Sequence, residues 1–127
     1  MRARSRGPKF LNLWQIRFPI GAVASIGHRI SGVLLLLCLP PLALSLDRSL
    51  HSEAEFEALR ELVSAPSRAL LLTVVVWAAA HHLLAGLRHL LMDVGAGSRL
   101  AQARISAWAV ILAAAIIAAA AALRWLT

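Results

Sequence analysis

The sequence predicts an all-α membrane protein with three transmembrane helices, and its composition and hydropathy pattern carry this prediction. Of its 127 residues, 60% are hydrophobic and 15% are charged, whereas soluble domains have about 45–50% apolar and 25% charged residues. The mean hydropathy is +0.75. The apolar residues fall into three blocks, each long enough for the roughly 20 residues that cross a hydrocarbon core. The length leaves room for a single domain over residues 1–127.

The first predicted helix covers about residues 18–46. Its segment from Ile30 to Leu46 carries no charge, whereas its first turns are more polar. A cleaved secretory signal has a shorter apolar region, so we expect this helix to remain in the mature protein. Pro40 and Pro41 lie in its second half and predict a kink there.

The second and third predicted helices cover about residues 68–93 and 105–126. The second is strongly apolar from Ala69 to Leu87 except for two adjacent histidines, and the third is rich in alanine. The short connection between these helices contains Gly95 and Gly97, which favour a break. The first connection, over residues 47–67, is acidic and contains Asp47, Glu53, Glu55, Glu57 and Glu61.

Basic residues predict the orientation, because positive charge near the ends of membrane helices favours the cytoplasmic side. The chain has 13 basic and 6 acidic residues and a net charge of +7. The basic residues near the helix ends place the N-terminus and the second connection in the cytoplasm. The acidic first connection and the C-terminus are then expected outside. Only one stretch concentrates positive charge, so nucleic-acid binding is disfavoured, and one cysteine cannot form a disulfide framework or bind an iron–sulfur cluster. The orienting residues are Arg2, Arg4, Arg6, Lys9, Arg17, Arg99 and Arg104.

Polar residues within membrane helices are costly, and a functional role is the default hypothesis for them. In the first helix, Ser25, His28 and Arg29 lie at i, i+3 and i+4 and therefore share one face. This face can bind a ligand that has acceptor oxygens. Alternatively, Arg29 extends to lipid headgroups and Ser25 bonds to a backbone carbonyl.

In the second helix, His82, Gly86 and His89 lie at i, i+4 and i+7 and share a face. The glycine lets a flat ring approach the backbone, so this face is suited to forming one wall of a haem site. His82 lies roughly 20 Å into a core of ~30 Å, counting ~1.5 Å per residue from Ala69. His81 points about 100° away from this face. The alternative for either histidine is a hydrogen bond between helices.

Two segments together carry a family resemblance. They are residues 15–32, QIRFPIGAVASIGHRISG, and residues 82–93, HLLAGLRHLLMD. In order and spacing they closely resemble the cytochrome b membrane-anchor subunits of bacterial succinate dehydrogenase, also called the C subunits of complex II. The three spans also match, while residues 47–67 and the third helix are similar only in character.

The resemblance implies a role for individual residues. The family's haem b has two histidine ligands, one from this subunit, here His82, and one from a second small anchor subunit in a heterodimeric membrane bundle. The family's ubiquinone pocket uses the positions of Ser25 and Arg29, and its apolar walls would include Phe18 and Ile26. Positions near the haem propionates correspond to His28, Arg29 and His89. The additional His81 departs from the family pattern.

The resemblance also implies a function, namely electron transfer from succinate to ubiquinone in the bacterial inner membrane. Succinate would be oxidised in a flavoprotein subunit that holds FAD, and electrons would pass through an iron–sulfur subunit, so the present chain alone would not oxidise succinate. Two alternatives stay open: the anchor of a fumarate reductase, and a small ion or proton transporter subunit. A transporter needs a polar path across the membrane, whereas the outer halves of the predicted helices are almost entirely apolar.

Overall fold

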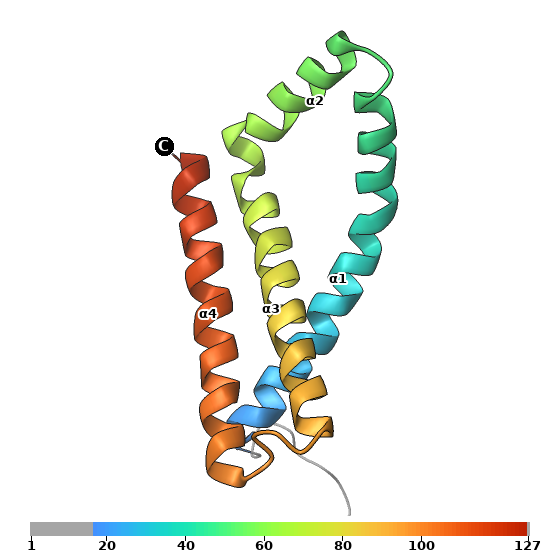
Figure 1. Ribbon diagram of the computed structural model, residues 1–127. Coiled ribbons are helices and arrows are strands. Elements are labelled where there is room, and N and C mark those ends of the chain that lie inside the picture. The colour runs from blue at the N-terminus through green and yellow to red at the C-terminus, as the bar shows by residue number, and fades with distance from the viewer. Residues whose placement is uncertain (1–16, 127) are drawn as a thin grey trace, which may run out of the picture.

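The computed structural model describes residues 17–126, which form helices and short connections. Three helices, α1, α3 and α4, are long and apolar enough to cross a membrane (Figure 1). This confirms the predicted all-α architecture with three spans. The helices are α1 (Ile20–Ser49), α2 (Glu53–Ser64), the short 3-10 helix η2 (Pro66–Arg68), α3 (Ala69–Asp93) and α4 (Leu100–Leu126). Outside the described residues lie Arg2, Arg4, Arg6 and Lys9, which entered the orientation prediction, and the first two motif residues, Gln15 and Ile16.

The connection between α3 and α4 is shorter than predicted, because α4 begins at Leu100 instead of about residue 105. The chain reverses at two glycines with positive φ, Gly95 at 84° and Gly97 at 73°. Glycine adopts this left-handed conformation without the steric cost that a Cβ atom brings. The two predicted breakers therefore do end the helix.

Helix α2 was not predicted, since residues 47–67 were interpreted only as an acidic connection. The Ser52 side chain accepts a hydrogen bond of 3.2 Å from the Glu55 backbone N–H and so caps the helix. Glu53 and Glu55 lie in the first turn, where negative charge is favourable. A serine followed three residues later by a glutamate is a recognised helix-start pattern, so the signal was present in the sequence.

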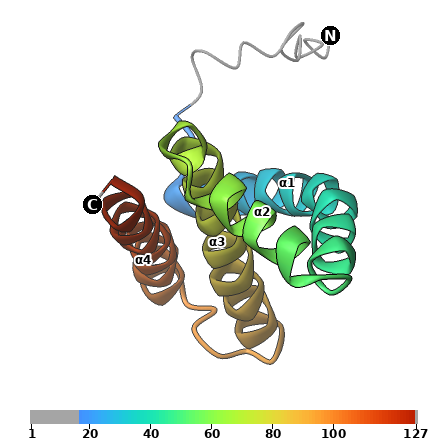
Figure 2. The ribbon, with the colours of Figure 1, turned by 90° about the horizontal axis from the view of Figure 1, so that it is seen from above.

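Helix α3 lies between α1 and α4 and packs against both (Figures 1 and 2). Near its N-terminal end, α1 crosses α3 closely, and the two helices then diverge toward α2, which connects their far ends. Helix α1 bends part-way along its length (Figure 1), and it contains Pro40 and Pro41, whose missing N–H groups and ring clashes account for the bend.

The buried core is small and consists mostly of alanines, which allow helix backbones to approach closely in a membrane. The buried polar or charged residues of the described chain are Ser31, His81 and Arg88. All three lie in what we call the polar half, residues 20–34, 78–93 and 100–113. Residues 35–77 and 114–126, whose polar side chains are not buried, form what we call the apolar half.

Candidate functional site: a histidine cluster between two helices

Three histidine rings gather where α1 crosses α3. The rings of His28 and His82 stack with their centroids 4.3 Å apart and their planes at 16°, and the His89 ring lies 5.2 Å from that of His28. A Cβ atom at Gly86 would lie 3.4 Å from His28 Nε2, so the missing side chain leaves space for this ring. The face of α3 predicted from spacing is therefore directed toward α1.

Hydrogen bonds to α1 fix the ring of His82. Its Nδ1 lies 3.1 Å from the His28 carbonyl oxygen and 3.4 Å from Ser31 Oγ. Ser31, which is fully buried, donates a hydrogen bond of 2.9 Å to the same carbonyl. A carbonyl oxygen only accepts, so Nδ1 carries the proton. Nε2 then keeps its lone pair, and it makes no hydrogen bond within residues 17–126.

Gly32 supports this ring position by steric means. A Cβ atom there would lie 2.9 Å from His82 Cε1, closer than side chains tolerate. The His82 ring therefore packs directly on the α1 backbone.

His81 engages the opposite ring nitrogen. Its Nε2 lies 3.2 Å from the Ala24 carbonyl oxygen, so Nε2 carries the proton. The ring is 3% exposed and stacks on Trp77 at 5.4 Å. Its Nδ1 is buried and has no hydrogen-bond partner among the described residues. In His81, therefore, the nitrogen that is left for a ligand, Nδ1, is enclosed by the protein.

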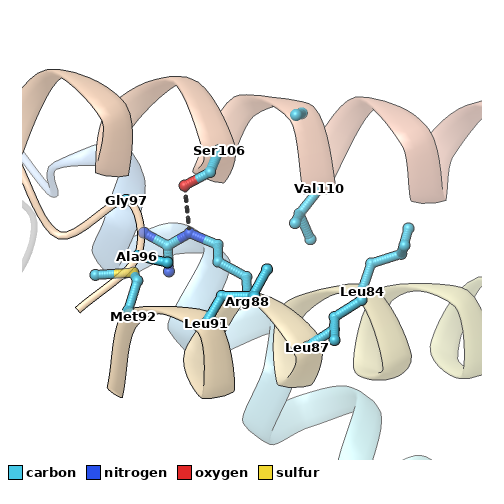
Figure 3. Close-up of a pocket in the computed structure, with 10 residues that line it drawn as sticks. Leu84, Leu87, Arg88, Leu91, Met92, Ala96, Gly97, Ser106 and Val110 are labelled. Carbon is cyan, nitrogen blue, oxygen red and sulfur yellow. Dashed lines mark hydrogen bonds between the residues drawn. The ribbon is translucent and has the colours of Figure 1, made fainter. Parts of the chain in front are cut away.

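Arg88 turns away from the histidine cluster and joins α3 to α4. Its Nε donates a hydrogen bond of 3.0 Å to Ser106 Oγ (Figure 3). Its Nη2 donates a second hydrogen bond, also of 3.0 Å, to the Ala103 carbonyl oxygen. The side chain is 8% exposed and, with Ser106, borders a largely apolar cavity of about 350 Å³. Leucines 84, 87 and 91 of α3 and Val110 of α4 line this cavity. Arg88 therefore holds two helices together.

The residues predicted to bind quinone lie on the first turns of α1 or just before them. Ser25 is half-buried and Arg29 is exposed, one helical turn later. Neither side chain makes a hydrogen bond or ion pair within residues 17–126, so the alternative in which Ser25 bonds to a backbone carbonyl is not observed. Phe18 and Ile26 are 47% and 42% exposed and add apolar surface beside them.

Three residues at the helix crossing were not singled out as site residues by the spacing argument: Gly27, Ser31 and Gly32. All three belong to the quoted segment 15–32. Ser31 and Gly32 lie three and four residues after His28, so they share its face. Their contacts with α3 depend on how the two helices cross, which a single-helix pattern does not show.

Comparison with known proteins decides the family. Residues 3–122 match the family described as succinate dehydrogenase/fumarate reductase transmembrane subunit. The chain belongs to this family. One relative, the succinate dehydrogenase cytochrome b556 subunit of Coxiella burnetii (strain RSA 493 / Nine Mile phase I), is 38% identical over 110 residues, which are 84% of this chain and 86% of the relative. The protein of the same name from Paracoccus denitrificans is 33% identical over 115 residues, 91% of this chain and 88% of the relative.

The family assignment agrees with the resemblance in the two segments of α1 and α3. It also agrees with the three helices long enough to span a membrane. The chain is therefore a multi-pass transmembrane subunit of the succinate dehydrogenase/fumarate reductase family, similar to subunits named cytochrome b556.

Proposed function

We propose that this chain is the cytochrome b anchor subunit of a succinate:ubiquinone oxidoreductase in the bacterial inner membrane. It would bind haem b together with a second small anchor subunit and form part of the ubiquinone-reduction site. FAD and the iron–sulfur clusters would lie in the flavoprotein and iron–sulfur subunits. The observation that carries the proposal is the ring of His82, held by its Nδ1–H on the His28 carbonyl with Nε2 left for a ligand.

The residues present fit a haem group, which His82 would hold through its Nε2. A histidine that ligates a metal commonly donates its other ring N–H to a carbonyl oxygen, which fixes the ring and raises the basicity of the ligating nitrogen. Within the described chain no group of three or more His, Cys, Asp or Glu side chains could hold a metal ion. A haem, whose porphyrin supplies four ligands, needs only one from this chain. When bound, it supplies one-electron oxidation and reduction.

His28, His89 and Arg29 are the donors proposed for the haem propionates. The His28 ring lies 4.3 Å from the ring of His82 and 5.2 Å from the ring of His89. Arg29 follows His28 directly and is free of ion pairs within residues 17–126. Donors from α1 and α3 therefore meet at one end of the proposed site.

Ubiquinone is proposed to bind beside Ser25 and Arg29, against the apolar side chains of Phe18 and Ile26. Ser25 would donate a hydrogen bond to a quinone carbonyl, and the Arg29 guanidinium would stabilise negative charge on the partly reduced ring. Quinol formation also requires two protons. Arginine does not release its proton in proteins, so water and groups of partner chains must supply them.

The proposal includes an orientation, with the polar half at the cytoplasmic side. The iron–sulfur subunit would dock there, because electrons must reach the quinone from that side. Reporter fusions at Arg99 and at Glu55 test this arrangement, since the two residues lie in or beside opposite connections of the bundle. We expect Arg99 in the cytoplasm and Glu55 outside; both reporters on one side would contradict the orientation and the number of spans.

The central experiment is purification of the native complex, followed by identification of its subunits and the spectrum of its reduced haem. We expect a low-spin haem with two histidine ligands. His82→Ala should lose or alter this haem because the axial ligand is removed. His81→Ala is the matched control and should retain it. An unchanged spectrum in His82→Ala would remove the ligand assignment.

A further inference from the structure

The contact between His81 and α1 is unusually close and involves a single turn of the helix. A Cβ atom at Gly27 would lie 2.6 Å from His81 Nε2 and 3.2 Å from Cε1, distances at which atoms overlap. Ala24, one turn earlier, is 1% exposed, and its carbonyl accepts the hydrogen bond from His81 Nε2. The imidazole therefore sits in a socket formed by Ala24 and Gly27.

The socket holds the ring in one orientation. Trp77 stacks on the ring at 5.4 Å with the planes at 23°. Nδ1 is enclosed without a partner, so a proton on this nitrogen would be a buried donor with nothing to bind. Nε2 carries a proton and donates the hydrogen bond to the Ala24 carbonyl oxygen. Rotating the ring would break this bond and press it against Gly27.

The turn that His81 holds is the one that carries the proposed quinone residues. Ser25 follows Ala24 directly, and Arg29 lies two residues after Gly27. The side chains of Ser25 and Arg29 make no hydrogen bonds within the described chain that would tie this turn to another helix. The bond from α3 to the Ala24 carbonyl thus ties this turn of α1 to α3.

We infer that His81 is a positioning residue of the quinone site: through the hydrogen bond from its Nε2 to the Ala24 carbonyl oxygen, it fixes the turn of α1 that presents Ser25 and Arg29. The inference rests on the proposed function, since it requires that quinone is reduced beside this turn. His81 acts through Ala24 and Gly27 and does not itself touch the quinone.

The first test removes the donor and then restores it. His81→Leu lacks the N–H, whereas in His81→Gln the side-chain amide can again donate toward Ala24. In assembled complexes with normal haem content, we expect His81→Leu to raise the KM for a short-chain ubiquinone about three- to tenfold, the range of one lost hydrogen bond. His81→Gln should remain within about twofold of wild type. Succinate oxidation with a soluble dye should be unchanged in both.

The second test fills the socket. Gly27→Ala should raise the KM for ubiquinone because the new methyl group displaces the His81 ring. Gly21→Ala is the matched control in the same helix, since the nearest atom to its Cβ is Arg88 Nη2 at 3.9 Å. In a His81→Ala background, Gly27→Ala should add little further loss, because the ring that it would displace is gone.

The outcomes separate this inference from the proposed function. If Arg29→Ala leaves quinone reduction unchanged, the quinone site is elsewhere and both proposals fall. If Arg29→Ala abolishes quinone reduction but His81→Leu and Gly27→Ala leave KM unchanged, only the positioning role is wrong. A purely structural role would lower dye and quinone activities in parallel, and this result would also overturn it. If His81→Leu does not assemble, the Gly27→Ala comparison decides.

Discussion

The two halves of the bundle differ in whether their polar side chains are buried. The polar half contains the buried polar residues of the described chain, and glycines and alanines bring its helices close enough to share hydrogen bonds. In the apolar half, α1 bends away from α3, and an apolar cavity of about 400 Å³ lies among α1, α2 and α3. Buried polar side chains of the described chain thus occur where neighbouring helices satisfy them, whereas the charged residues of the apolar half are not buried. Within residues 17–126 the buried polar side chains lie at one end of the bundle and form no path across the membrane, which argues against an ion or proton transporter.

The adjacent pair His81 and His82 gives a finer comparison within the polar half. A rotation of about 100° per residue separates their directions. His81 reaches α1 with Nε2, and His82 reaches it with Nδ1. The roles therefore depend on which ring nitrogen contacts the backbone of α1. His81, bonded through Nε2, joins two helices, whereas His82, bonded through Nδ1, keeps Nε2 for the proposed metal ligation.

Among the variants of the polar half, Arg29→Ala is expected to have the largest effect on the rate of quinone reduction. Removing a charge-assisted contact to a developing anion costs about 2 to 4 kcal/mol, so quinone reduction should slow by about a hundredfold or more. Succinate oxidation with a soluble dye should remain near the wild-type rate in complexes with intact subunits and haem. A wild-type rate of quinone reduction would instead favour the interpretation that Arg29 extends to lipid headgroups.

Ser25→Ala should act in the same direction with a smaller effect. It removes a neutral donor, and we expect a loss of roughly 1 to 3 kcal/mol in quinone reduction. The ratio of quinone to dye activity is the measurement, because it cancels differences in the amount of assembled complex. An unchanged ratio would exclude Ser25 from the quinone site.

Gly32→Ala tests whether the close crossing of α1 and α3 positions the His82 ring. The new Cβ atom would lie 2.9 Å from His82 Cε1, so the ring must move from the His28 carbonyl. Overpacking of this kind costs about 1 to 3 kcal/mol. We expect a lower midpoint of thermal unfolding and less bound haem. Gly21→Ala should change neither, because its Cβ atom would make only an ordinary van der Waals contact, at 3.9 Å from Arg88 Nη2. Equal behaviour of the two variants would contradict the described crossing.

The sequence predicts the three spans and one functional face of α3, but it does not predict the contacts between helices. The three spans follow from long apolar blocks, and the face that joins His82, Gly86 and His89 follows from helical periodicity within α3. The pairing of His81 with Gly27 depends on the relative position of two helices, which no pattern within one helix determines. Helix α2 differs from the prediction for another reason: the acidic composition of residues 47–67 predicts a connection, although the capping residue Ser52 is visible in the sequence.

The smallest effect is expected in the apolar half, from Glu57→Gln on α2. Glu57 and Arg60 form an ion pair of 3.1 Å, but their side chains are 50% and 69% exposed. Exposed pairs of this kind contribute less than about 0.5 kcal/mol because solvent screens them and ordering two long side chains costs entropy. The midpoint of thermal unfolding and the KM for ubiquinone should both stay at their wild-type values. Ser52→Ala, in the same helix, should lower stability by about 1 kcal/mol through loss of the cap. A Glu57→Gln effect as large as that of Gly32→Ala would show that α2 contributes to stability through a contact beyond this chain, and the contrast between the two halves would no longer hold.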